Sequence, residues 1–169
     1  SLLKGKADIA VHSLKDVPAI LDSRFEIMPI LDRECPQDIM ISNKFSSLDA
    51  MPKNAKIGTS SPRRMALLRA VSTEFKIVEI RGNIETRLKK LEEGKCDAMI
   101  LAAAGLRRLN LEKKITQYIS VSNFIPSAGQ GVLCVEYLKK NKEIKKLVNN
   151  LANHELNMCV TQEREFVKT

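Results

Sequence analysis

Arginines that could do chemistry occur singly or in pairs where predicted strands end. A guanidinium group pairs with a carboxylate or a phosphate through two hydrogen bonds at once, so several of them around one ligand favour an organic polyanion. Such arginines lie at the ends of three predicted strands and are Arg63, Arg64, Arg81, Arg87, Arg107 and Arg108. The sequence therefore predicts a cleft for a ligand that carries several carboxylates or phosphates.

The clearest of these segments is IGTSSPRR, residues 57–64. Residues 59–61 offer hydroxyl and backbone N–H groups, and Pro62 suits the first position of a helix, whose amino end attracts anions. Arg63 and Arg64 would each oppose the helix dipole by about 0.3–1 kcal/mol, a cost that a bound anion reverses. The alternative is an ordinary capped helix with solvated arginines.

Two further segments repeat the pattern more weakly. In EIRGNIETRL, Arg81 ends a strand, Asn83 can cap the following helix, and Arg87 lies four residues further on the same helical face. A solvated helix-surface position is the ordinary alternative for Arg87. In ILAAAGLRRL, the small residues before Arg107 and Arg108 would let a flat ligand approach the backbone closely.

One prominent carboxylate, Asp16, stands against these cations in the segment ADIAVHSLKDVPAI. The apolar run 9–11 predicts a buried strand, yet ionisable side chains follow it at once and Pro18 stops regular structure. The residues alone leave two interpretations open. Asp16 forms a salt bridge with Lys15 or an arginine, or the strand delivers it into a ligand site.

Strand-like and helix-like segments alternate along the chain, which is typical of βαβ crossovers and a parallel sheet. The predicted strands cover residues 7–12, 55–61, 75–80, 96–105 and 132–138. The predicted helices cover residues 44–51, 62–71, 83–93, 139–146 and 150–166. Parallel sheets bind ligands beyond the carboxyl ends of their strands. The arginines, hydroxyls and Asp16 at the predicted strand ends are therefore expected to lie where a ligand binds.

The net charge of +8 favours an acidic partner, which could be nucleic acid, a membrane surface or a small polyanion. Only five Phe and two Tyr are present, with no Trp, so stacking platforms for nucleic acid bases are poorly supplied. We therefore expect a small-molecule substrate, with neither nucleic acid nor a membrane as partner.

The composition favours a globular cytoplasmic protein. The chain has 169 residues and is 44% hydrophobic, so it can bury a core. Its longest apolar stretch, 98–106, is about half of what a bilayer span needs, and no signal segment opens the sequence. No metal site is predicted, because His12 and His154 have no second ligand at metal spacing. Free thiols, rather than disulfides or metal ligands, are expected for Cys35, Cys96, Cys134 and Cys159.

Four segments together closely resemble the porphobilinogen deaminases, also called hydroxymethylbilane synthases: ADIAVHSLKDVP, IGTSSPRR, RGNIETRLKKLEEGKCDAMILAAAGLRRL and PSAGQG. The resemblance runs over essentially the whole chain. It implies a transferase of haem and porphyrin biosynthesis that deaminates four porphobilinogen molecules and joins them into linear hydroxymethylbilane on a covalent dipyrromethane primer. It also implies three domains, of which the first two resemble periplasmic binding proteins and enclose the active cleft.

Carried over by position, the resemblance implies that Asp16 is the catalytic carboxylate, which stabilises the electron-poor azafulvene left when ammonia departs and shuttles protons. The positions that match cofactor contacts are Ser13, Lys15, Thr59, Ser60, Ser61, Arg63, Arg64 and Asn83. The positions that match substrate contacts are Arg81, Arg87, Arg108 and Gln130. The arginines would neutralise the acetate and propionate groups of the growing chain.

The fold class expected from the resemblance is α/β, with two periplasmic-binding-protein-like lobes, mostly parallel sheets, and a third α+β domain absent. Residues 1–32 and 128–149 would form part of the first lobe, 33–127 the second, and 150–169 a helix leading into the missing domain. None of the four cysteines matches the primer-holding position. We therefore expect the primer on a cysteine outside this chain, an inactive fragment, and a monomeric parent protein.

Two other functions stay open at this point. A non-catalytic organic-anion-binding protein would share the fold and the arginines at the strand ends but would not require Asp16. A nucleic-acid binder would show an affinity for DNA that falls steeply with salt and no preference for small carboxylates.

Overall fold

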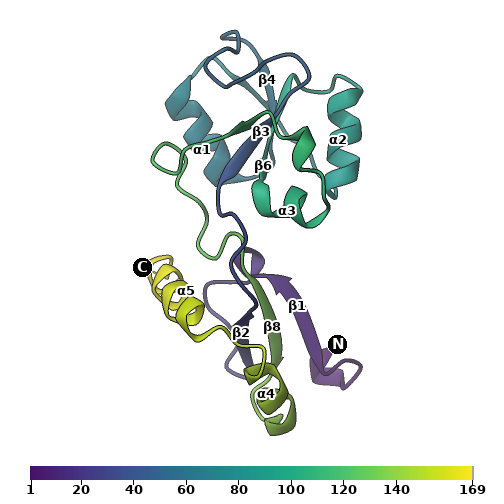
Figure 1. Cartoon of the computed structure of the whole chain (residues 1–169), viewed down its shortest axis with the longest axis vertical. Coiled ribbons are helices and arrows are strands. Elements are labelled where there is room, and N and C mark those ends of the chain that lie inside the picture. The colour runs from purple at the N-terminus through teal and green to yellow at the C-terminus, as the bar shows by residue number, and fades with distance from the viewer. Residues whose placement is uncertain (169) are drawn as a thin grey trace. The chain divides into compact units, whose positions relative to one another are not determined.

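The computed structural model describes residues 1–168, which fold as two compact units. Unit 1 is formed by residues 1–35 together with the chain from residue 127 onward. Unit 2 is formed by Pro36–Pro126. The chain thus passes from one unit to the other twice, and each unit is described by itself below (Figure 1). Within residues 1–168 there is no helix long and apolar enough to cross a membrane.

Unit 1 is built on a three-stranded antiparallel sheet in the order β1-β8-β2. Strand β8 (Leu133–Leu138) lies between β1 (Ile9–Ser13) and β2 (Phe25–Ile30), with Val135 opposite both Val11 and Met28. Two short 3-10 turns flank β1: η1 (Leu2–Lys4) precedes it and η2 (Leu14–Asp16) follows it. The sheet therefore ends, on the β1 side, in the turn that carries Asp16.

Two helices complete unit 1, α4 (Lys142–Asn149) and α5 (His154–Phe166). Asn141 and Asn153 cap them, since each side-chain oxygen accepts a hydrogen bond from a backbone N–H three residues on. The buried side chains that α5 shares with η2 and β8 are Leu14, Val17, Val132, Cys134, Leu156 and Val160. The prediction from sequence separated residues 150–169 from the first lobe, but this apolar packing makes α5 part of unit 1.

Unit 2 has a five-stranded sheet in the order β5-β4-β6-β3-β7. The strands are β3 (Asp38–Ile41), β4 (Lys56–Gly58), β5 (Lys76–Val78), β6 (Ala98–Ala102) and β7 (Gln117–Tyr118). Strand β4 pairs in parallel with β5 and β6, whereas β3 runs antiparallel to β6 and β7. The core between sheet and helices contains Met40, Ile57, Leu68, Ala98, Ile100 and Phe124.

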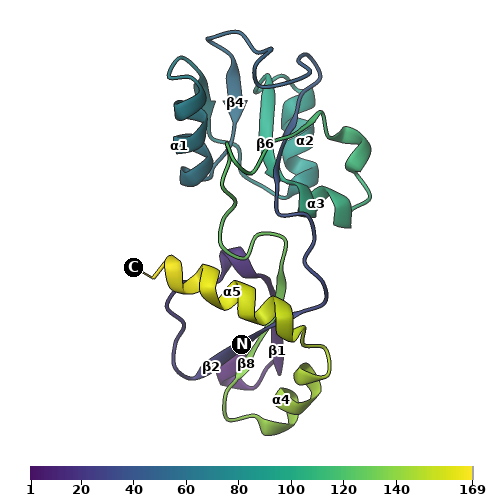
Figure 2. The ribbon, with the colours of Figure 1, turned by 60° about the vertical axis from the view of Figure 1, so that its left-hand side comes forward.

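The helices of unit 2 are α1 (Pro62–Val71), α2 (Ile84–Glu92) and α3 (Ala103–Arg108), followed by the 3-10 turn η3 (Glu112–Lys114). Helices α1 and α2 lie on opposite sides of the sheet (Figures 1 and 2). This placement follows from right-handed crossovers, because the chain steps outward from β4 to β5 through α1 and back across β4 to β6 through α2.

The expectation of mostly parallel sheets is wrong in detail. Unit 1 is entirely antiparallel, and unit 2 is parallel only around β4. The strands missed from the sequence are β2, β3 and β7, which pair only with antiparallel neighbours. Antiparallel pairing requires no helical crossover, so the alternation of strands and helices did not reveal these strands.

The helix predicted at residues 44–51 is also absent from the structure, which has turns there. The Ser42 hydroxyl accepts hydrogen bonds from the backbone N–H groups of Lys44 and Phe45. Such local side-chain acceptors compete with helical hydrogen bonds and stabilise a turn instead.

Two glycines with φ in the left-handed region provide a matched stability test: Gly131, with φ 87°, and Gly94, with φ 72°. An alanine Cβ at Gly131 would lie 2.1 Å from the carbonyl oxygen of Glu34, whereas at Gly94 it would meet nothing within 4 Å. Left-handed backbone alone costs a residue with a Cβ about 1–2 kcal/mol. We expect Gly131→Ala to lower the free energy of unfolding clearly more than Gly94→Ala does, as measured by urea titration. Equal losses would contradict the close approach of the two backbone segments.

Candidate functional site

The residues predicted to form the site fall into two groups, one in each unit. Ser13, Lys15, Asp16 and Gln130 belong to unit 1. The remaining positions belong to unit 2 and are Thr59, Ser60, Ser61, Arg63, Arg64, Arg81, Asn83, Arg87 and Arg108. Within each unit, the structure shows which of them lie together.

Asp16 lies at the exposed end of the turn η2, directly after β1. The turn is anchored by Leu14, whose side chain is buried and whose backbone N–H donates to the carbonyl oxygen of Val132 at 2.9 Å. Among the described residues of unit 1, none makes a hydrogen bond or an ion pair with the Asp16 carboxylate. A salt bridge with Lys15 is therefore not observed, and the turn presents a negative charge that unit 1 does not neutralise.

Lys15 and Gln130, which are 115 residues apart in the chain, meet in unit 1. The Lys15 ammonium donates to the side-chain oxygen of the fully buried Gln130 at 3.3 Å. Arg33 donates from its Nε to the backbone carbonyl of the same glutamine at 3.0 Å, and its guanidinium forms an ion pair with Glu163 of α5. Glu163 also accepts a hydrogen bond from the Gly129 N–H at 2.7 Å. The segment that carries Gln130 is thus fixed from several sides.

The Glu163 carboxyl gives a prediction for pH dependence. Burial raises its pKa, but hydrogen bonds from Arg33 and from the Gly129 amide outweigh burial, so the pKa lies below its ordinary value of 4.5. A carboxyl whose pKa is lowered by folding stabilises the protein above its unfolded pKa, and that stabilisation is lost as the pH falls. We expect the difference in unfolding free energy between wild type and Glu163→Gln to shrink as the pH drops below 4.5. Urea titrations at about pH 7 and about pH 3 measure it, and a difference that grows toward low pH would contradict the assignment.

In unit 2, the segment before α1 forms the predicted capped helix start. The Ser61 hydroxyl accepts a long hydrogen bond, 3.5 Å, from the backbone N–H of Arg64, and Pro62 occupies the first turn. Thr59 is buried, and its hydroxyl accepts from the Ser61 N–H at 3.2 Å. Hydroxyls and the amino end of a helix are therefore gathered where β4 ends, as an anion site requires.

The sequence analysis missed Asp38, which organises the two arginines of this helix start. Asp38 begins β3 and its side chain is fully buried. Arg64 donates from Nε and Nη2 to one carboxylate oxygen at 3.0 and 2.8 Å, and Arg63 reaches the other oxygen with Nη2 at 2.7 Å. A carboxylate in an otherwise apolar strand, DIMI, was the only signal available in the sequence.

Solvated arginines, the ordinary alternative from sequence, are not observed here: 7% of the Arg64 side chain and 23% of the Arg63 side chain is exposed. Burial lowers the pKa of the Arg64 guanidinium, and the Asp38 carboxylate opposes that shift. The positive charges of Arg63 and Arg87 lower it further, because both repel the guanidinium of Arg64. Positive charge is therefore concentrated around Arg64.

Three other predicted site residues of unit 2, Asn83, Arg87 and Arg81, bond to groups close to them in the chain. Asn83 caps α2, since its side-chain oxygen accepts from the Thr86 N–H at 2.8 Å, and Arg87 donates to the Gly82 carbonyl at 2.7 Å. Arg81 is exposed and pairs with its near neighbour Glu79. Arg108 ends α3 and is exposed. Arg87 thus lies near enough to Arg64 to act on its charge, whereas Arg81 is exposed to solvent.

The cysteines bear on how a pyrrole primer could be held. All four are free thiols, and two of them are buried, Cys96 and Cys134. Burial raises the pKa of Cys134 to about 11 and also raises that of Cys96, so neither is a thiolate at neutral pH. Residues 1–168 contain no group of three His, Cys, Asp or Glu side chains that could hold a metal ion, and His12 pairs with Glu136 at 2.9 Å.

Comparison with known proteins identifies relatives of the chain. A family model described as "Porphobilinogen deaminase, dipyromethane cofactor binding domain" matches residues 1–146. Porphobilinogen deaminase of Ruthia magnifica is 47% identical over 97% of this chain and 54% of its own length. That of Francisella tularensis strain WY96-3418 is 45% identical over 98% of the chain and 55% of its own length. The chain therefore spans about half the length of the curated relatives it matches, and the description confirms dipyrromethane as the family's cofactor.

Solved structures with little sequence identity share the fold. An ABC transporter periplasmic substrate-binding protein from Coxiella burnetii is 17% identical, with a TM-score of 0.60 over 96% of this chain and 78% of its own. A lipoprotein of the YaeC family from Enterococcus faecalis is 14% identical, with a TM-score of 0.57 over 97% of this chain and 79% of its own. The expected α/β fold of the periplasmic-binding-protein type is confirmed by this likeness, which bears on the fold alone.

Proposed function

The chain belongs to the porphobilinogen deaminase family, and from this premise we propose that it carries the catalytic carboxylate and primer contacts of a hydroxymethylbilane synthase. Such an enzyme deaminates four porphobilinogen molecules and joins them into the linear tetrapyrrole of haem and porphyrin biosynthesis. The observation that carries the proposal is Asp16, an exposed carboxylate on the turn η2 that bonds to no described residue of unit 1, in a family member with several arginines at its strand ends.

The residues of the α1 amino end fit a primer that carries several carboxylates. Arg63 and Arg64 bring two positive charges to the buried carboxylate of Asp38, and the hydroxyls of residues 59–61 belong to the segment directly before them. When bound, dipyrromethane supplies the end to which new pyrrole units are joined. We propose that Arg63, Arg64 and the three hydroxyls neutralise and orient its carboxylates, and that Ser13, Lys15 and Asn83 contribute further contacts.

Asp16 is proposed to act on the reacting pyrrole. Deamination breaks a carbon–nitrogen bond, releases ammonia and leaves an electron-poor azafulvene. Joining then forms a carbon–carbon bond and releases one proton. A carboxylate beside the pyrrole N–H groups stabilises the positive charge as it develops and can take up that proton. No described residue of unit 1 neutralises Asp16, which leaves its charge available within that unit for this purpose.

Gln130 and the arginines Arg81, Arg87 and Arg108 are proposed to hold substrate. Arg81 is exposed and could exchange its partner Glu79 for a substrate carboxylate, since exposed ion pairs are worth about 0–1 kcal/mol. Arg87 adds its charge to the group formed by Arg63 and Arg64. Lys15, bonded to Gln130, links the Asp16 turn to the segment that carries the glutamine.

We propose that the primer is attached to a cysteine outside this chain. Two of its cysteines are buried thiols with raised pKa, and the covalent bond requires a reactive sulfur. Free cysteines suit a reducing compartment, which supports a cytoplasmic enzyme. Intact mass spectrometry of the 169-residue chain after incubation with porphobilinogen is expected to show no covalent pyrrole. A chain carrying added dipyrromethane would mean that one of its own cysteines holds the primer.

The test of the function is a protein of full family length that contains this chain. It is expected to consume porphobilinogen and to release linear tetrapyrrole. The second candidate function is that of an organic-anion-binding protein of the same fold. The similarity of the fold to a periplasmic substrate-binding protein supports this alternative. Saturable binding of porphobilinogen without any turnover would favour that function and overturn the first.

A further inference from the structure

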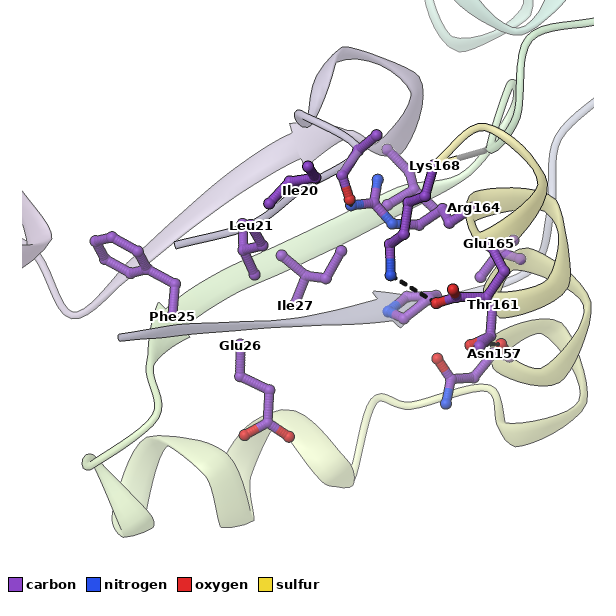
Figure 3. Close-up of a pocket in the computed structure, with 14 residues that line it drawn as sticks. Ile20, Leu21, Phe25, Glu26, Ile27, Asn157, Thr161, Arg164, Glu165 and Lys168 are labelled. Atoms are coloured by element: carbon purple, nitrogen blue, oxygen red, sulfur yellow. Dashed lines mark hydrogen bonds and ion pairs between the residues drawn. The ribbon is translucent and has the colours of Figure 1, made fainter. Parts of the chain in front are cut away.

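The segment that follows Asp16 is fastened to α5 by one arginine. The Arg164 guanidinium donates from Nη1 to the Val17 carbonyl at 3.4 Å, and from Nη2 to the carbonyls of Pro18 and Ala19 at 2.7 and 3.2 Å. Three successive backbone carbonyls thus share one side chain, which reaches from α5 toward the segment that holds Ile20 (Figure 3).

Regular secondary structure does not order this segment. Pro18 has no N–H to donate, and residues 17–22 lie outside any helix or strand. The segment borders a pocket of about 470 Å³ instead of a filled core, and its Ile20 side chain is 80% exposed. Apolar packing holds the segment through the buried Val17 and the partly buried Leu21, while the guanidinium fixes the carbonyl groups of residues 17–19 between them.

Arg164 belongs to a helix, α5, that packs against the core of unit 1. Its helix places Leu156 and Val160 among the buried side chains that also include Leu14 and Val17. The preceding residue, Glu163, fixes the Gly129 amide and Arg33. Consecutive residues of α5 thus hold both segments that flank the Lys15–Gln130 contact.

We propose that Arg164 is a positioning residue for Asp16, acting through the carbonyls of residues 17–19; this inference rests on the proposed function. Only a guanidinium presents several N–H donors in a fixed fork, so one side chain can serve three acceptors at once. By fixing the carbonyls directly after Asp16, it sets the direction in which η2 presents the carboxylate. A displacement of about 1 Å in a reacting group can cost up to a hundredfold in rate.

The test is a double-mutant cycle in a protein of full family length that contains this chain. Arg164→Gln is expected to lower kcat about ten- to a hundredfold with KM changed less than about threefold, because the carboxylate is displaced while the substrate-binding arginines remain. In an Asp16→Asn background, Arg164→Gln is expected to have almost no further effect on kcat, since both changes remove the same contribution. Arg164→Lys is expected to restore only part of the rate.

Lys168→Gln is the matched control. Lys168 follows the end of α5 and, like Arg164, is a positively charged residue that lines the pocket. Its ammonium group bonds to Glu165 at 2.6 Å instead of to the segment after Asp16 (Figure 3). Its removal is expected to leave kcat unchanged. If Arg164→Gln lowers kcat by the same factor with and without Asp16, the positioning role is wrong and Arg164 serves stability or another residue.

Hydrogen exchange of the 169-residue chain separates failure of this inference from failure of the proposed function. Arg164→Gln is expected to speed exchange of the Val17 amide, which donates to the Leu14 carbonyl at 3.1 Å, more than tenfold, with the amides of β8 unchanged. Unchanged exchange at Val17 would overturn the inference even if the enzyme is active. Faster exchange there in a protein without turnover would overturn the proposed function and leave Arg164 as the restraint on the segment.

Discussion

Replacing Asp16 with Asn is expected to lower the turnover of porphobilinogen at least about a hundredfold, with little change in KM. Positioned acid–base groups contribute about 10²–10⁴-fold to rate. The amide keeps the size of the side chain and its hydrogen-bonding shape but loses the negative charge, so cation stabilisation and proton uptake are lost while the arginines still bind carboxylates. Steady-state kcat and KM, measured on a protein of full family length that contains this chain, separate these two effects.

The matched control is Asp22→Asn, six positions further along the same unit. Asp22 is exposed and pairs with Arg24 at 2.6 Å, and hydrogen bonds from the Arg24 side chain and backbone lower its pKa to about 2. Its removal is expected to leave kcat within about twofold, since an exposed ion pair contributes little. Near-normal turnover by Asp16→Asn would show that another group stabilises the cation.

The second large effect concerns stability. Asp38→Asn is expected to lower the free energy of unfolding by about 3–5 kcal/mol, because removing one partner of a buried ion pair leaves an uncompensated buried charge. Here the asparagine oxygen can still accept from Arg64, but the negative charge is lost and an NH2 group would face the Arg63 guanidinium in place of the second carboxylate oxygen. Urea titration of the 169-residue chain, followed by circular dichroism, measures the loss.

Glu74→Gln is the control for this measurement in the same unit. Glu74 pairs with Lys53 at 3.3 Å, and both side chains are largely exposed. Its loss is expected to cost less than about 1 kcal/mol. A similarly small cost for Asp38→Asn would mean that Arg63 and Arg64 do not depend on the buried carboxylate, and the account of how they are held would have to be given up.

The parts of the site that could be predicted from the sequence depend on neighbouring residues. The capped start of α1 follows from a serine before a proline, and the cap at Asn83 follows from an asparagine before an apolar helical pattern. The turn after β1 was predictable in the same way, because Pro18 ends regular structure directly after Asp16.

The parts that could not be predicted depend on residues far apart in the chain. Asp38 meets Arg64 across 26 positions, and nothing local distinguishes it from a surface carboxylate. Arg164 meets Pro18 across 146 positions, and Glu163 meets Arg33 across 130. Sheet direction was missed for the same reason, because antiparallel neighbours such as β1 and β8 come from opposite ends of the sequence.

The intact mass of the Asp16→Asn protein at full family length, taken after mixing with excess porphobilinogen, tests the central claim most directly. Primer binding is assigned to the arginines and hydroxyls of unit 2, and the addition of pyrrole units is assigned to the Asp16 charge. Wild type is expected to show a series of masses, each one pyrrole unit apart, whereas Asp16→Asn is expected to stay at the mass of the primer-bearing protein. The same series in Asp16→Asn, formed at the wild-type rate, would contradict the assignment of the chemistry to Asp16.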